Sequence, residues 1–149
     1  MDLHKTYETL DQDRCIEIIA AYGVGPRDIR LLQTYWVHLT IVNKDGGYPP
    51  LLPFKGYRGV IRGESLPPMI FNVLVESAIS HWVMVVAAME AGTEGLGDLV
   101  KDLAAYFYVD DGLIVLTQLE RTKRDFDVLT DLFKWVGLWT NTRKTLRME

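Results

Sequence analysis

The sequence contains a single cysteine, Cys15, among 149 residues. A lone cysteine excludes an internal disulfide and a zinc site built from several cysteines, and it suits a reducing, intracellular compartment. The histidines, His4, His38 and His81, are scattered without the short spacing of metal ligands. No basic tract stands out and the formal net charge is −4, so the charge expected of an autonomous nucleic-acid binder is missing. A polynucleotide would therefore have to be held with help from elsewhere.

Hydrophobic residues make up 48% of the chain, which allows one domain with a real core over residues 1–149. The first residues mix charged and apolar side chains, so we expect no signal peptide. The longest apolar run covers residues 69–89. Within it Asn72, Glu76 and Ser80 recur every four residues and form a polar stripe along one helical face. The run therefore predicts a long core helix over 68–90, without a membrane as partner.

Helical spacing recurs in other segments of the chain. Residues 11–22 begin with acidic side chains and are followed by Gly23, a residue typical of a helix end. Pro26 stands where a proline is tolerated in the first turn of a second helix, whose apolar face includes Trp36. Residues 119–136 resume the helical spacing and end at Gly137.

Strand signals lie between the helical segments. Residues 40–60 contain short β-branched or aromatic runs broken by "DGG" and prolines, which predict a hairpin or irregular β segment. In "AAYFYVDDGLIVLT", residues 104–117, alternation places Tyr106, Tyr108 and Asp110 on one side of a strand. Here "DDG" predicts a tight turn between two strands, and "LWTN" at 138–141 predicts a short final strand. Mixed strands and helices predict an α+β domain.

The adjacent carboxylates of Asp110 and Asp111 interrupt an otherwise apolar run. Burial of a charged group in such a run costs free energy unless a partner neutralises the charge or solvent reaches it. One interpretation is a solvated hairpin tip, and the other is a metal site. A two-metal phosphoryl-transfer site needs several carboxylates that converge on Mg²⁺ ions about 3.5–4 Å apart, and a hairpin tip can present two of them rigidly. A third acid must come from another strand.

Four segments, taken in order, resemble the polymerase motifs of one family. "YVDD" at 108–111 looks like motif C, "DLHKTYETLD" at 2–11 resembles motif A, "RGVIRGESLPPMIFN" at 58–72 looks like motif B, and "VGLWTNTRKT" at 136–145 resembles motif D. The family is that of the reverse transcriptases, the RNA-directed DNA polymerases, of non-LTR retroelements. Order and spacing agree across nearly the whole chain, and such a series is much more specific than one pair of aspartates.

The resemblance implies the fold of a polymerase palm, with antiparallel strands on one face and helices behind. It also implies a site at which Asp2, Asp110 and Asp111 bind Mg²⁺, with Mn²⁺ as a substitute. Its substrates would be an RNA template, a DNA primer and a deoxynucleoside triphosphate. The remaining fingers and thumb segments of a longer polyprotein would be its partners.

The same resemblance assigns roles to residues around the metal site. Tyr7 would pack beneath the sugar of the incoming nucleotide and discourage a 2′-hydroxyl. Arg62 and Gly63, in the loop of motif B, and Asn72, in the helix that follows, would contact template or nucleotide. Lys144 would act as the general acid that protonates the leaving pyrophosphate.

Each of these residues also has a purely structural interpretation. Asp2 would then be only a charged residue at the chain terminus. Tyr7 would be an aromatic residue of the core whose hydroxyl group reaches solvent. Lys144 would belong to a basic, solvated tail. Asn72 would only make one face of the helix polar and solvent-exposed. Gly63 would only give the backbone the freedom to turn from the loop into the helix.

Motif B departs from the pattern of the family, which usually reads glutamine–glycine–aspartate–proline–leucine–serine–proline. Arg62 stands in place of the glutamine, and Glu64 in place of the aspartate. Ser65 replaces the first proline and Pro67 the serine. Because an arginine accepts no hydrogen bonds, the contacts of this loop with the substrate cannot be those of an amide.

Met1 directly precedes Asp2, so we expect the strand that carries Asp2 to be almost absent and the terminus to fray unless it is tied down. Fingers and thumb are largely missing from the sequence. Positioning and electrostatic stabilisation carry most of phosphoryl-transfer catalysis, so we expect the isolated chain to be inactive or nearly so. Two alternatives remain open: an inactive, truncated retroelement remnant that at most binds a partner, and an unrelated α+β binding domain whose "YVDDG" is only a turn.

Overall fold

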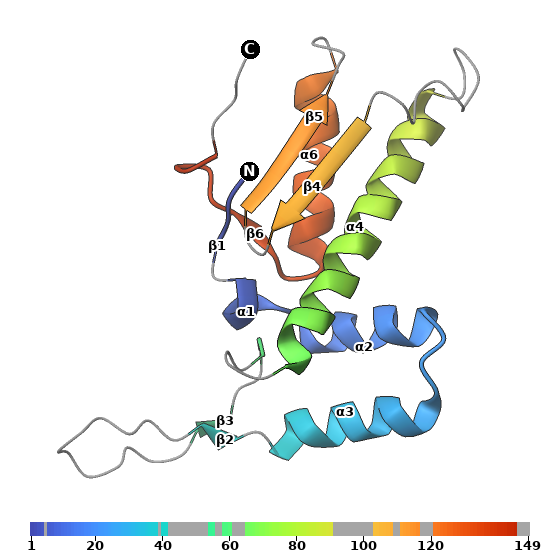
Figure 1. Ribbon diagram of the computed structural model, residues 1–149, viewed down its shortest axis with the longest axis vertical. Coiled ribbons are helices and arrows are strands. Elements are labelled where there is room, and N and C mark those ends of the chain that lie inside the picture. The colour runs from blue at the N-terminus through green and yellow to red at the C-terminus, as the bar shows by residue number, and fades with distance from the viewer. Residues whose placement is uncertain are drawn as a thin grey trace, which may run out of the picture.

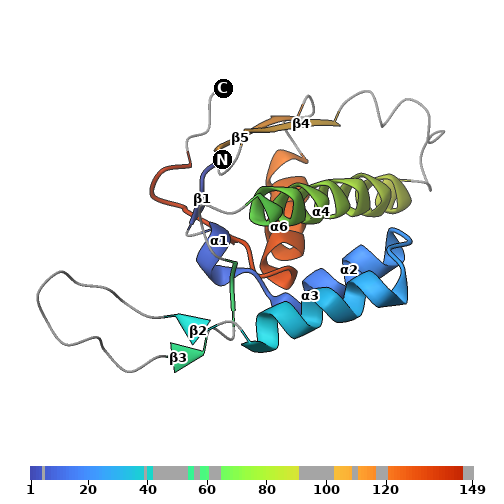
Figure 2. The ribbon, with the colours of Figure 1, turned by 60° about the horizontal axis from the view of Figure 1, so that its bottom comes forward.

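The computed structural model describes residues 1–4, 6–38, 40–41, 54–55, 58–60, 65–90, 103–108, 111–116 and 121–145. The fold is mixed α+β, and its larger strands lie on one side of a set of helices (Figures 1 and 2). The expected α+β class is therefore confirmed.

The strands form antiparallel pairs. They are β1 (Leu3–His4) with β6 (Trp139–Thr140), β2 (Thr40–Ile41) with β3 (Phe54–Lys55), and β4 (Leu103–Tyr108) with β5 (Asp111–Leu116). A single β-bridge between Asp2 and Asp111 joins the first pair to the third. The bridge gives the order β6–β1–β5–β4 in space, and Figure 1 shows β1 beside β5.

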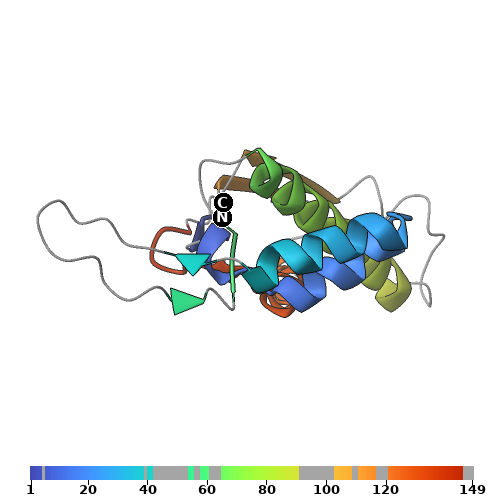
Figure 3. The ribbon, with the colours of Figure 1, turned by 90° about the horizontal axis from the view of Figure 1, so that it is seen from below.

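The helices form two layers behind these strands. The inner layer contains α4 (Leu66–Glu90) and α6 (Thr122–Trp135), and the outer layer α2 (Gln12–Ala21) and α3 (Pro26–His38). Figure 2 shows the hairpin, then α4 and α6, then α2 and α3, and Figure 3 shows the last two side by side beneath α4. The short α1 (Thr6–Thr9) lies between β1 and the start of α4 (Figure 1).

The core lies between the sheet and α2. Trp82 of α4 is fully buried and donates a hydrogen bond of 2.7 Å from Nε1 to the carbonyl oxygen of Asp125 in α6. The ring of Phe107 from β4 meets that of Phe133 from α6 edge to face, with 5.4 Å between centroids. A fully buried indole usually needs a partner for its N–H, so the Trp82 bond helps to fix how α4 and α6 pack.

Among the described residues, α4 is the one helix long and apolar enough to cross a membrane. Its buried residues lie on the side that packs against α2 and α6; they include Phe71, Leu74, Ala78, Trp82 and Val86. The predicted polar stripe is exposed, and the hydroxyl of Ser80 lies 3.5 Å from the Glu76 carboxylate that accepts its hydrogen bond. α4 thus packs in this structure as a core helix with one polar face.

The helix ends follow the sequence closely. Asp11 caps α2, its side chain accepting hydrogen bonds from the N–H groups of Asp13 and Arg14 at 3.1 Å. Gly23 and Gly137 follow α2 and α6 in the left-handed conformation, with φ of +89° and +85°. The predicted helix ends are therefore confirmed, because an L side chain rarely adopts that conformation.

Strand boundaries follow the sequence less closely. The segment 40–60 does contain an antiparallel pair, and the predicted final strand is β6, but "DDG" is not the turn. Asp111 and Gly112 already belong to β5, and Asp111 pairs with Tyr108, so β5 begins at the second aspartate of this segment. The turn prediction was wrong in register because Asp111 and Gly112 gain ladder partners on β4.

Candidate functional site

Asp2 and Asp111 lie directly opposite each other at the junction of β1 and β5. The next pair along the ladder, Met1 and Gly112, exchanges both hydrogen bonds: Met1 N donates to Gly112 O at 2.6 Å, and Gly112 N donates to Met1 O at 2.7 Å. Asp2 and Asp111 therefore occupy a non-hydrogen-bonded position, where opposed Cβ atoms come within about 4.5–5.5 Å. The side chains of two aspartates that are far apart in the sequence therefore leave the backbone at neighbouring positions.

Both aspartates are on the outer face of the sheet, away from α4 and α6. Leu3, the residue after Asp2, is almost fully buried, so Asp2 points to the opposite face. Asp111 is exposed and stands across from Tyr108, whose side chain is 83% exposed. The pair is therefore open to a ligand or to solvent.

Asp2 is also held on its other side, by the segment that follows β6. Its carbonyl oxygen accepts a hydrogen bond of 2.8 Å from Asn141 N, and its N–H donates to Oγ1 of Thr145 at 3.3 Å. The Thr145 hydroxyl in turn donates to the Asn141 carbonyl oxygen at 2.9 Å. The terminus is therefore tied down on both sides, by Gly112 of β5 and by the segment after β6, so the condition under which we expected it to fray is not met.

Lys144 belongs to that same segment. It is exposed, and its N–H donates to the Asn141 carbonyl oxygen at 3.1 Å in the turn that ends at Thr145. This turn brings Lys144 next to the residue that contacts Asp2. The structure thus places the backbone of Lys144 on one side of Asp2 and Asp111 on the other, at the junction of β1 and β5.

The third expected metal ligand, Asp110, lies outside the described residues. Within the described ranges, no three acidic, histidine or cysteine side chains converge as a metal site. The donors that are brought together, the carboxylates of Asp2 and Asp111, are hard oxygen ligands of the kind that Mg²⁺ and Mn²⁺ bind. Two carboxylates from neighbouring strands therefore fit a divalent cation, with Asp110 directly adjoining Asp111 in the chain.

Tyr7 is located in α1, next to the start of α4. Its half-buried ring packs against Phe71, with 5.7 Å between the ring centroids. Its carbonyl oxygen accepts a hydrogen bond of 2.6 Å from Val60 N. This packing is what the core-aromatic interpretation predicts, and contact of the ring with a nucleotide sugar stays a prediction.

The loop of motif B is described only at its two ends. Arg62 and Gly63 lie outside the described residues, but Val60 before them is anchored to Tyr7 and Leu66 begins α4. Asn72 is exposed on α4, next to Phe71. Tyr7 thus contacts Val60 before this loop and Phe71 of α4 after it. The exposed position of Asn72 is compatible with its structural and with its substrate-binding interpretation.

Sequence reasoning missed an aromatic surface beside the carboxylates. Tyr106 and Tyr108 of β4 are 65% and 83% exposed, on the same outer face as Asp111. Alternation along 104–117 places both tyrosines on one side of a strand, but it does not say which side is open. Exposed aromatic rings are the groups on which nucleic-acid bases stack.

One buried carboxylate lies outside the site. Asp125, in the first turn of α6, is buried and makes an ion pair of 2.8 Å between its Oδ1 and Nη2 of Arg124. Nε of the same guanidinium also donates to Oδ1 at 2.9 Å. The paired charge is accounted for by this contact, so we assign Asp125 a structural role.

Comparisons of the sequence with known proteins identify no relative of the chain. No protein-family model matches the chain, and no curated protein sequence matches it. The function proposed next therefore depends on the motifs in the sequence and on the arrangement of the described residues.

Proposed function

We propose that the chain is the palm domain of a reverse transcriptase, which transfers a nucleotide to the 3′-hydroxyl of a DNA primer on an RNA template. The observation that carries the proposal is the position of Asp2 opposite Asp111. More than a hundred residues separate them in sequence, and motifs A and C predict that they share a site. In a domain unrelated to the family, nothing in the sequence would lead us to expect these two carboxylates at neighbouring positions.

The electrostatics of the pair support a cation-binding role. Like charges directly opposite each other on a sheet are destabilising by about 0.2–1 kcal/mol. Among the described residues, no ion pair to a lysine or arginine side chain compensates Asp2 or Asp111. Two like charges on an open face, without a lysine or arginine partner among the described residues, favour a bound cation.

The proposal assigns Asp2, Asp110 and Asp111 to Mg²⁺ or Mn²⁺. When bound, the metal ions would lower the pKa of the attacking hydroxyl and neutralise charge on the phosphates. Lys144 would donate a proton to the pyrophosphate leaving group, and Tyr7 would contact the sugar. Arg62, Gly63 and Asn72 would orient the template or the nucleotide, since positioning carries much of this reaction.

Two measurements test the proposal. The first is Mn²⁺ binding, followed by the loss of the free-ion electron paramagnetic resonance signal. We expect binding by the unmodified chain, strong weakening in Asp2→Asn and Asp111→Asn, and no change in Asp131→Asn, which removes an exposed carboxylate of α6. Binding that is absent, or equal in all four proteins, contradicts the metal site.

The second measurement is primer extension on an RNA template with Mg²⁺ or Mn²⁺, at protein in excess over primer. Because positioning carries much of this reaction and the motif B loop departs from the pattern of the family, we expect a slow reaction. Asp110→Asn should abolish what extension there is, while Asp131→Asn should keep it. Extension that is equal in the unmodified chain and in Asp110→Asn would contradict catalysis by this site.

The substitutions in motif B favour a second candidate function, a catalytically inactive relative that binds a partner. Arg62 and Pro67 replace residues that the family uses in its substrate loop. The experiments above separate the two candidates. Mn²⁺ binding at Asp2 and Asp111 with no extension at all would favour the inactive relative over the polymerase.

A further inference from the structure

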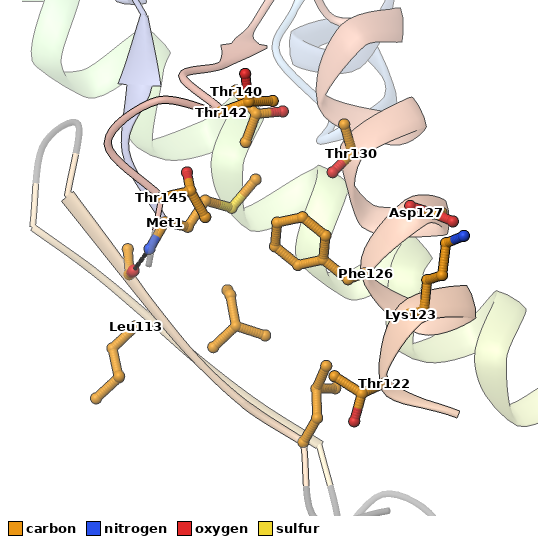
Figure 4. A pocket seen from close by; sticks show the side chains of 13 residues that line it. Met1, Leu113, Thr122, Lys123, Phe126, Asp127, Thr130, Thr140, Thr142 and Thr145 are labelled. Carbon is orange, nitrogen blue, oxygen red and sulfur yellow. Dashed lines mark hydrogen bonds between the residues drawn. The ribbon is translucent and has the colours of Figure 1, made fainter. Parts of the chain in front are cut away.

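Trp139 is on the outer face of the sheet, the face that also carries Asp2 and Asp111. Its neighbour Thr140 pairs with the buried Leu3 and lines the pocket between β5 and α6, on the inner side of the sheet (Figure 4). Because successive side chains of a strand point to opposite faces, Trp139 is directed outward. Its side chain is 44% exposed, so a large aromatic ring is accessible on the face of the two carboxylates.

The pairing of β1 with β6 sets the distance between this ring and the carboxylates. Trp139 is opposite His4, and His4 follows Asp2 by two residues on the same face of β1. Adjacent strands are about 4.8 Å apart and two residues of a strand span about 6.8 Å, so the Cα atoms of Trp139 and Asp2 are roughly 8 Å apart. Since β1 and β6 are neighbours in the sheet, a ligand held at Asp2 can reach the indole ring without crossing another strand.

A positive charge lies beside the ring. Nζ of Lys134, in the last turn of α6, is 5.5 Å from the centroid of the Trp139 ring. The face of an indole attracts a cation at that distance, which holds the ammonium group close to the ring. Lys134 is itself exposed, so the same charge can approach an anionic ligand.

These groups are complementary to the parts of a nucleotide. The carboxylates of Asp2 and Asp111 fit the divalent cation that binds phosphates, and the ammonium group of Lys134 adds positive charge nearby. The indole of Trp139 is a surface on which a nucleobase stacks. An apolar peptide needs neither the cation nor the ammonium group, so the combination favours a ligand with both phosphates and a flat aromatic ring.

We propose that Trp139 stacks against the base of the nucleoside triphosphate whose phosphates bind the cation at Asp2 and Asp111. The base lies on the face of the indole that Lys134 does not cover. Stacking recognises the flat ring of a base and not its edge, so Trp139 helps to position the nucleotide whichever base it carries. This contact rests on the proposed function, to which it adds a nucleotide-binding residue from β6.

Trp135 provides a matched control. It is 49% exposed, close to the value for Trp139, but the guanidinium group of Arg14 from α2 lies over its ring, 4.7 Å from the centroid. Trp135 therefore belongs to the contact between α6 and α2. Its replacement should leave the nucleotide site intact.

The first test compares two ligands in saturating Mg²⁺, deoxyadenosine triphosphate and tripolyphosphate, which lacks a base. By isothermal titration calorimetry, Trp139→Ala should bind deoxyadenosine triphosphate about tenfold or more weakly than the unmodified chain does, but tripolyphosphate within about twofold. Trp139→Phe keeps an aromatic ring and should recover most of the affinity for the nucleotide. Trp135→Ala should bind both ligands as the unmodified chain does, with folding of all variants checked by circular dichroism. Equal weakening of both ligands in Trp139→Ala, or weakening of neither, overturns the proposal.

Tryptophan fluorescence adds a readout that a purely structural role of Trp139 would not change. A base stacked on an indole quenches its emission, so deoxyadenosine triphosphate with Mg²⁺ should quench the unmodified chain and Trp135→Phe. The same nucleotide should not quench Trp139→Phe, and tripolyphosphate should quench none of the three proteins. Quenching by the nucleotide that persists in Trp139→Phe overturns the proposal.

Mn²⁺ binding, followed by electron paramagnetic resonance, separates a failure of this contact from a failure of the proposed function. If the unmodified chain binds no Mn²⁺, both are overturned. If it binds Mn²⁺ at Asp2 and Asp111 but the Trp139 variants show no selective loss of the nucleotide, only stacking on Trp139 is overturned. A selective loss in Trp139→Ala, in a chain that extends no primer, supports the stacking contact and contradicts the polymerase.

Discussion

The ring of Phe107 takes the space that a side chain at position 112 would fill. Phe107 and Gly112 are directly opposite in the β4–β5 ladder, and a Cβ built at Gly112 would overlap the ring. The same ring packs edge to face on Phe133 of α6. Gly112 thus lets the hairpin sit closely on the helix while its neighbour Asp111 stays on the outer face.

Gly112→Ala should therefore destabilise the protein. The added methyl forces Phe107 to move from its contact with Phe133, and overpacking of this kind costs about 1–3 kcal/mol. Urea unfolding followed by circular dichroism measures the change. Gly25→Ala is the control, because a Cβ there meets no atom within 4 Å, and its effect should be much smaller. Equal losses in the two variants would contradict this account of Gly112.

Gly59 and Gly23 form a second matched pair. Both have positive φ, +77° and +89°, but a Cβ at Gly59 would lie 2.5 Å from the carbonyl oxygen of Tyr7, whereas one at Gly23 meets no atom within 4 Å. Gly23→Ala should cost only the left-handed conformation, about 1–2 kcal/mol. Gly59→Ala should cost about 1–3 kcal/mol more, because the segment must leave α1. Equal unfolding free energies for the two variants would show that the close contact between Gly59 and the backbone of α1 does not limit the size of the residue at position 59.

The opposed carboxylates predict a metal-dependent change in stability. In the presence of a chelator, Asp2→Asn and Asp111→Asn should each raise the free energy of unfolding by about 0.2–1 kcal/mol, because each removes one of two like charges. Mg²⁺ should stabilise the unmodified chain by mass action and should stabilise either variant much less. Thermal unfolding with and without Mg²⁺ measures both effects, with Asp131→Asn as control. Equal stabilisation of all the proteins would contradict a site at Asp2 and Asp111.

The helices could be predicted from the sequence because their signals are local. Asp11, Pro26 and Gly137 mark helix ends by their own backbone and capping chemistry, which needs no distant partner. The polar stripe through Glu76 likewise follows from helical periodicity alone. These predictions are confirmed by α2, α3, α4 and α6.

The sheet could not be predicted in the same way, because its partners are far apart in the chain. Strand β1 has only the residues Leu3 and His4, too few for any periodic signal, and it exists through its bonds to β6 and β5. The register that makes Asp111 part of β5 is likewise set by pairing with Tyr108. The sequence could name both aspartates of the candidate site, but only the register places them opposite each other.

Cys15 provides a test of the core that does not involve the site. The thiol is completely buried in α2, and burial is the main reason that its pKa rises from 9.0 to about 12, with the nearby negative charge of Asp11 adding to the effect. A thiolate forms only with the loss of that burial. The folded chain should therefore react very slowly with thiol reagents at pH 8, and urea should restore the ordinary rate.

The same shift predicts how stability depends on pH. Below about pH 9 the thiol is protonated in both states, so Cys15 contributes no pH dependence. Between pH 9 and about 12 the unfolded chain loses the proton and the folded chain keeps it, so the free energy of unfolding falls by up to about 1.4 kcal/mol per pH unit. Urea unfolding of the unmodified chain and of Cys15→Ala from pH 7 to 10.5 isolates this contribution, since the other titrating groups are common to both. The stability advantage of the unmodified chain should shrink above pH 9, and a constant difference would show that the thiol of Cys15 ionises as readily in the folded chain as in the unfolded one.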